Sequence, residues 1–187
     1  MRSPTKKWLK IACLLCVTSS IQLQADELPH EKGRWSDLVD WPLVAIHAVI
    51  TPQGKVMAFG TAKRGDQFLY NVWDPDLGTG EHSHNLLPST LGVNSFCNAS
   101  IVLPETGNIL MSGGTLPGNV GVADVPIFNT GSASLSQAPS MSSARWYPTA
   151  TTLANGETLL TGGRDGTGIP VVTPEIYSSE SNTWRSL

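Results

Sequence analysis

The sequence predicts an all-β protein made of repeated four-stranded sheets. Its 187 residues include 18 Gly and 13 Pro, and only 14% are charged, a composition that favours turns and strands over helices. Apolar residues make up 40% of the chain, which is enough for a folded core. After residue 30 no window has helical periodicity, whereas one pattern of short apolar runs and turn residues recurs.

The first 25 residues have the pattern of a secretory signal peptide. Met1–Lys10 is basic, Ile11–Val17 is apolar, and Thr18–Ala25 is polar and ends in a small residue suited to cleavage. The apolar run is far shorter than the roughly 20 residues that span a bilayer, so we expect no membrane span. An uncleaved anchor is the alternative. We therefore expect a secreted or periplasmic protein.

Charge and cysteine content limit the partners. Beyond residue 25 the chain has 8 basic and 15 acidic residues, a net charge of −7, so we expect no nucleic acid or anionic membrane as partner. Cys97 is the only cysteine after the predicted leader. An exported chain with one cysteine cannot close an internal disulfide, so its thiol is buried, pairs with another chain or has a chemical role.

Three segments of the chain repeat one pattern. They are His47–Gly60, Phe96–Gly114 and Tyr147–Gly163, and each reads as an extended segment, a tight turn with Gly, a short apolar strand and a final Gly or Gly-Gly. The turn glycines are 53 and 49 residues apart, and the strand-ending glycines 54 and 49. A period of roughly 50 residues is that of kelch repeats, the blades of a β-propeller.

The repeat predicts about three four-stranded blades in a ring that is not closed. The runs Val56–Phe59, Ile109–Met111 and Thr158–Leu160 are apolar without alternation, as strands buried on both faces are. Three repeats are fewer than the four to eight blades that close a propeller, so we expect a fragment or a ring completed by another chain. We expect a lead-in at 26–40 and the blades at 41–187. The aromatic residues expected to pack within blades are Trp73, Phe128, Tyr177 and Trp184.

Aligning the repeats places Cys97 and Tyr147 at equivalent positions. Cys97 lies six residues before Leu103, and Tyr147 lies six residues before Leu153 of the next repeat. The inner strands of a propeller line its axial channel, so equivalent residues there share one height. We expect the sulfur and the phenol to come within bonding reach. Taken without the Tyr147 alignment, Cys97 is better explained as a small buried hydrophobe, a common fate of free cysteine.

These motifs resemble those of the copper radical oxidases, a family that includes galactose oxidase, glyoxal oxidase and bacterial galactose-oxidase-like proteins. The resemblance rests on Phe96-Cys97 followed by Gly113-Gly114, and on Ala144–Tyr147 followed by Gly162-Gly163. The segments WPL and NVWDP look like the bacterial members in particular. The resemblance spans roughly residues 33–187, which correspond to the early blades of the family domain. The resemblance implies oxidation of a primary alcohol or aldehyde by O₂, which becomes H₂O₂.

The resemblance also implies a cofactor. In the family the motif cysteine and tyrosine are joined by a thioether, so Cys97 and Tyr147 become the expected catalytic, cofactor-binding pair, with Tyr147 as a copper ligand in a complete domain. The family's copper also needs two histidines and a second tyrosine from later blades, so we expect this chain not to assemble the site and to be inactive alone. The implied substrate is a small alcohol, aldehyde or carbohydrate of open identity.

One position departs from the family pattern. Arg164 stands where galactose oxidase has a tryptophan that stacks on the tyrosine, and this weakens galactose specificity. Trp146 is expected to be a poor substitute, because neighbours on a strand point to opposite faces.

Other interpretations stay open. The chain is alternatively a non-catalytic kelch module that binds a glycan or a protein, with a free Cys97 and no copper, or a truncated product without function. His82 and His84 form an H-x-H pair that could bind a metal, but a solvated outer strand is the better prediction. We discount the Asn98–Ser100 sequon because it adjoins a predicted interior. Arg145 either orients the neighbouring loop or is a surface charge.

Overall fold

The computed structural model describes residues 29–62, 69–116 and 120–187. The predicted signal peptide at 1–25 and the start of the lead-in lie outside the described residues. The chain divides into two units, Met1–Leu38 and Val39–Leu187. In the first unit the described residues include one short helix, α1, at Pro29–Lys32. The second unit contains the strands.

The described strands form three four-stranded antiparallel sheets and one two-stranded sheet. The strand orders are β1-β2-β3-β4, β10-β9-β6-β5, β11-β12-β13-β14 and β7-β8. This all-β arrangement confirms the predicted partial propeller of about three blades without closure. The strand bounds are β1 Leu43–Ile50, β2 Val56–Ala62, β3 Leu69–Trp73, β4 His84–Pro88, β5 Ala99–Val102, β6 Ile109–Ser112, β7 Thr115–Leu116, β8 Val120–Gly121, β9 Pro126–Asn129, β10 Ser134–Gln137, β11 Thr149–Thr152, β12 Thr158–Thr161, β13 Glu175–Ser178 and β14 Thr183–Ser186.

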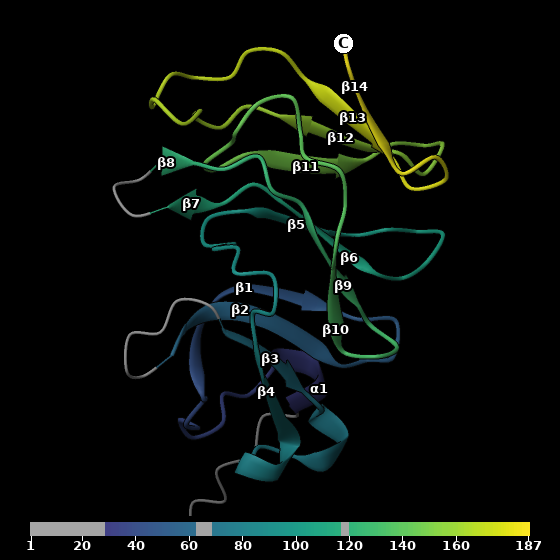
Figure 1. The fold of residues 1–187 in the computed structure, drawn as a ribbon. Coiled ribbons are helices and arrows are strands. Elements are labelled where there is room, and N and C mark those ends of the chain that lie inside the picture. The colour runs from purple at the N-terminus through teal and green to yellow at the C-terminus, as the bar shows by residue number, and fades with distance from the viewer. Residues whose placement is uncertain (1–28, 63–68, 117–119) are drawn as a thin grey trace, which may run out of the picture. The chain divides into compact units, whose positions relative to one another are not determined.

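The blades adjoin through their first strands. Strand β5 contacts both β1 and β11, so the innermost strands of the three blades follow one another (Figure 1). Two short 3-10 helices, Pro75–Leu77 and Glu81–Ser83, connect β3 to β4 at the outer side of the first blade.

Strand β6 explains why the central strands lack polar alternation. All of its residues are buried, and successive side chains point to opposite faces. Ile109 and Met111 enter the core shared with Phe59 of the first blade, whereas Leu110 enters the core shared with Leu160 of the third. Because each buried side chain of this size contributes about 1.5–3 kcal/mol, stacking blades face to face supplies much of the fold's stability.

The Gly113-Gly114 pair that follows β6 is required because another part of the backbone packs closely against it. Gly113 has φ +78°, and a Cβ there would lie 2.3 Å from the carbonyl oxygen of Arg145. The end of the second blade therefore lies against the backbone that enters the third. A side chain at this position would separate the two blades.

We predict that Gly113→Ala destabilises the chain more than Gly54→Ala does. Gly54 has a similar φ of +75° but open space around it, so its variant should lose only the about 1–2 kcal/mol of left-handed strain. Gly113→Ala adds an overpacking cost of about 1–3 kcal/mol. Urea unfolding of both variants measures the difference, and equal losses would show that the blades do not meet closely at Gly113.

Candidate active site

Cys97 and Tyr147 lie in equivalent turns at the start of successive blades. Each stands two residues before the first strand of its blade, β5 or β11. Each has left-handed backbone, with φ of 62° and 59°. Such values are uncommon for residues other than Gly, and strained backbone of this kind concentrates at functional sites. Both residues are therefore in turns, and not on the inner strands that we expected.

The structure brings these two residues together. The Tyr147 N–H donates to the Cys97 carbonyl oxygen at 3.1 Å, which joins the two turns. A hydrogen bond to the Cys97 side chain, the electrostatic effect of that side chain and burial together raise the pKa of Tyr147. Cys97 is 2% exposed and Tyr147 is 62% exposed. A buried sulfur thus lies against a phenol that opens to solvent; the catalytic roles of the pair stay predictions.

His47 is a third member of the site, which the sequence analysis missed. Its Nε2 accepts the Cys97 N–H at 3.0 Å. Burial lowers the pKa of His47, which favours the neutral ring that can accept this bond. The available signal was a single histidine within the apolar run LVAIHAVI, where a half-buried imidazole needs a partner.

The structure corrects our expectation for Trp146. Its ring centroid lies 4.9 Å from that of Tyr147, with 38° between the planes. Strand alternation does not separate the two side chains, because the left-handed turn at Tyr147 interrupts extended backbone. The Trp146 N–H donates to the Arg164 carbonyl at 2.7 Å. Residues lining an open hollow beside the phenol are Trp146, Tyr147, Gly163, Arg164 and Pro170.

Arg145 is a buried residue, not a surface charge. Its side chain has 0% exposure and pairs with Glu175, which has 1%, at 2.8 Å. The guanidinium also donates to the carbonyls of Gly162 at 2.7 Å and Thr173 at 2.6 Å. Burial raises the pKa of Glu175, but hydrogen bonds from Arg145 and Ser142 outweigh it and leave that pKa below its ordinary value. The pair fixes the backbone two residues before Tyr147, as the first of our two interpretations expected.

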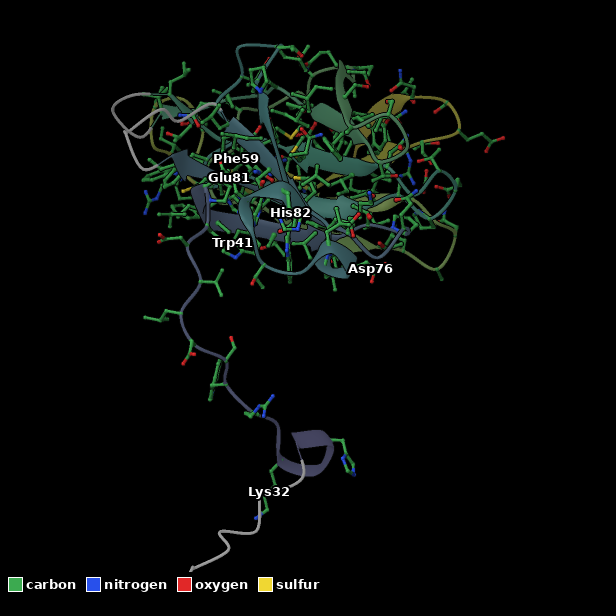
Figure 2. All side chains as sticks on the ribbon, turned by 90° about the horizontal axis from the view of Figure 1, so that it is seen from below. Lys32, Trp41, Phe59, Asp76, Glu81 and His82 are labelled. Carbon is green, nitrogen blue, oxygen red and sulfur yellow. The ribbon has the colours of Figure 1, made fainter. Side chains whose placement is uncertain are left out.

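The other residues that we considered lie apart from this pair. Figure 2 shows His82 beside Glu81 on the 3-10 segment between β3 and β4. His82 Nε2 lies 3.1 Å from the Leu77 carbonyl, whereas His84 Nδ1 lies 3.0 Å from the Asn71 amide. Within residues 29–62, 69–116 and 120–187, no three His, Cys, Asp or Glu side chains gather as a metal site.

Buried side chains account for two smaller predictions. The Asn98 amide is buried and donates to the Ser95 carbonyl, which agrees with discounting the sequon. Tyr177 and Trp184 pack with ring centroids 5.1 Å apart, as expected of a blade.

In the described part of the chain, no helix has the length and apolarity needed to cross a membrane.

Comparisons with known proteins agree with this fold. The Kelch motif model matches residues 145–187. Two galactose oxidases from Gibberella zeae are each 29% identical over 163 residues, which cover 83% of this chain and 23% of theirs. A fungal alcohol oxidase of the AA5 family, solved in complex with copper, has a TM-score of 0.63 and 19% identity over 81% of this chain and 32% of its own.

These findings confirm the predicted resemblance to galactose oxidase-like kelch proteins. The similarity to the solved alcohol oxidase, at 19% identity, supports the fold alone. Particular closeness to bacterial members stays a prediction. The chain spans about a quarter of the length of the curated relatives it matches.

We predict that Glu175→Gln destabilises the chain by about 3–5 kcal/mol at neutral pH, because it leaves the Arg145 charge buried without its partner. The matched control is Glu157→Gln, which removes an ion pair to the half-exposed Arg185 and should cost far less, because solvent screens exposed charges. Chemical unfolding measures both losses. Similar losses in the two variants would contradict this account.

The stability difference between the wild type and Glu175→Gln should also depend on pH in one direction. Because the folded pKa lies below the ordinary value of about 4.3, the advantage of the wild type persists above that pH and shrinks as the pH falls below it. A difference between wild type and Glu175→Gln that grows on acidification would contradict the lowered pKa.

Replacing Cys97 should lower the pKa of Tyr147. In Cys97→Ala the phenol loses its sulfur partner, and its pKa should move down towards the ordinary value of about 10. Ultraviolet titration of tyrosinate, with Tyr147→Phe identifying the Tyr147 contribution, measures the change. An unaltered titration in Cys97→Ala would mean that the two side chains do not interact.

Proposed function

Because the chain is similar to galactose oxidases over most of its length, we propose that it carries the thiol–phenol part of a copper radical oxidase site. The reaction would be oxidation of a primary alcohol or aldehyde by O₂, which becomes H₂O₂. The observation that supports this most directly is that the equivalent turns of Cys97 and Tyr147 are joined by the hydrogen bond from the Tyr147 N–H to the Cys97 carbonyl oxygen at 3.1 Å, and that the Cys97 side chain raises the pKa of Tyr147. The two residues would become a thioether-linked redox pair.

The surroundings of the pair suit that chemistry. An ordinary phenol is protonated at neutral pH and resists one-electron oxidation; a sulfur substituent beside the hydroxyl donates electron density to the ring. Cys97 is buried, which shields its sulfur from other oxidants, while Tyr147 is exposed on the side that a metal and a substrate would approach. Copper bound at that oxygen would supply Lewis acidity and redox capacity.

The described residues fit the side-chain part of this cofactor but not a whole copper site. Tyr147 would provide one oxygen ligand. His47 Nε2 is engaged by Cys97, and His84 Nδ1 by Asn71, so neither nitrogen is available without rearrangement. Because no three His, Cys, Asp or Glu side chains of the described residues gather as a metal site, a copper site would need further ligands from elsewhere.

The hollow beside Tyr147 is the proposed place for a small alcohol, aldehyde or carbohydrate. Trp146 offers an apolar surface on one side, and the exposed Arg164 offers a positive charge. Export to a secreted or periplasmic location, with cleavage of residues 1–25, belongs to the same proposal.

Exposing the purified chain to Cu(II) and O₂ tests the pair. We expect loss of two hydrogens and a crosslinked peptide that joins Cys97 to Tyr147. The sulfur–carbon bond replaces one S–H and one ring C–H bond, and the two protons and two electrons reduce O₂ to H₂O₂. Peptide mass spectrometry measures the product.

Cys97→Ser and Tyr147→Phe are the controls and should give no such peptide. Wild-type protein that keeps an alkylatable Cys97 after this treatment, with no crosslink, would contradict the proposal. That result, together with absent copper uptake, would favour the non-catalytic kelch module that binds a glycan or protein.

A further inference from the structure

The turn that holds Cys97 depends on a side chain from the first blade. The Cys97 N–H donates to His47 Nε2 across 50 positions of sequence. One blade later the corresponding contact is made by backbone alone, where the Tyr147 N–H donates to the Cys97 carbonyl. An imidazole in β1 thus takes the place of a backbone carbonyl.

The first blade lacks that carbonyl because β1 is longer than its counterparts. The N–H groups of Thr51, Leu103 and Leu153 close equivalent turns in the three blades, which aligns these residues. Six residues before Thr51 stands Ala45, the counterpart of Cys97 and Tyr147 in sequence. Ala45 lies within β1 opposite Gly60, and its φ is not positive.

A β-bulge sets the direction of His47. The pairing of β1 with β2 runs from Leu43 to Ala45, skips Ile46 and resumes with His47 opposite Phe59. A bulge adds one unpaired residue and changes the direction of the side chains beside it. The imidazole consequently reaches the Cys97 turn of the second blade.

We propose that His47 is the positioning residue of the Cys97–Tyr147 pair: by accepting the Cys97 N–H, it holds the left-handed turn that directs the sulfur at the phenol. A backbone amide can only donate, so His47 Nε2 carries no proton and the ring proton is on Nδ1. The contact itself requires no copper. Its chemical consequence, faster thioether formation, rests on the proposed function.

His47→Leu and His47→Gln test this role in the full chain. Leucine offers no acceptor, whereas the glutamine oxygen can accept the Cys97 N–H. Without copper, we expect His47→Leu to raise the alkylation rate of Cys97 by iodoacetamide about tenfold, the effect of one lost hydrogen bond, and His47→Gln to restore most of the protection. Peptide mass spectrometry distinguishes Cys97 from Cys13 and Cys16.

His84→Leu is the matched control. It removes another half-buried imidazole of the first blade, one that contacts Asn71 and not Cys97, so it should leave Cys97 alkylation unchanged. Thermal melts followed by circular dichroism compare the stability of all variants. Equal alkylation of Cys97 in wild type and His47→Leu would overturn the proposal, as would equal increases in His47→Leu and His84→Leu.

Two further outcomes separate the positioning role from the proposed function. If the wild type forms no thioether with Cu(II) and O₂ but His47→Leu still exposes Cys97, the proposed function fails and the positioning role stands. If the wild type crosslinks and His47→Leu does so equally fast, the positioning role fails alone. If His47→Leu does not fold, nitrogen-15 spectra of the wild type decide: an unprotonated Nε2 on His47 supports the proposal, and an Nε2–H ring overturns it.

Discussion

Two left-handed turns on the inner side of this protein have backbone N–H groups that need hydrogen-bond acceptors, and the contacts that supply these acceptors determine how the blades meet. The N–H groups of Cys97 and Tyr147 point away from their own blades, and each finds its acceptor in the blade before it. A peptide group left unpaired away from water is costly, so these contacts order the blades as well as the turns. The same geometry places a thiol against a phenol, and the redox proposal follows from that placement.

Close packing around Arg145 supports those turns from the other side. The Arg145 carbonyl accepts from Gly114, while its guanidinium reaches Glu175 in the third blade. A single residue thereby joins the second blade to the third immediately before Tyr147. A buried ion pair is weak support for stability in itself, but here the Arg145 guanidinium also donates to the carbonyls of Gly162 and Thr173, which ties it to the backbone around it. The position of the phenol is therefore defined by buried groups, although the ring itself is exposed.

The sequence repeat made the fold and the Cys97–Tyr147 pair predictable. The other residues of the site could not be predicted, because their positions depend on local irregularities of the backbone. The glycine periods located the central strands, and equal spacing from Leu103 and Leu153 identified Cys97 and Tyr147. His47 was missed because its role depends on a bulge at Ile46, and a break in strand pairing leaves no mark in hydrophobic periodicity. The same limit applies to Trp146, whose nearness to the phenol comes from positive φ at a non-glycine residue.

The most direct test is an NMR measurement on the reduced, copper-free chain. Nuclear Overhauser effects should connect the Cys97 β protons with the Tyr147 ring protons, and they should disappear on unfolding. A folded chain in which these protons show no such effect, while Tyr147 contacts its sequence neighbours normally, would contradict the account, because sulfur and phenol would then have no shared site.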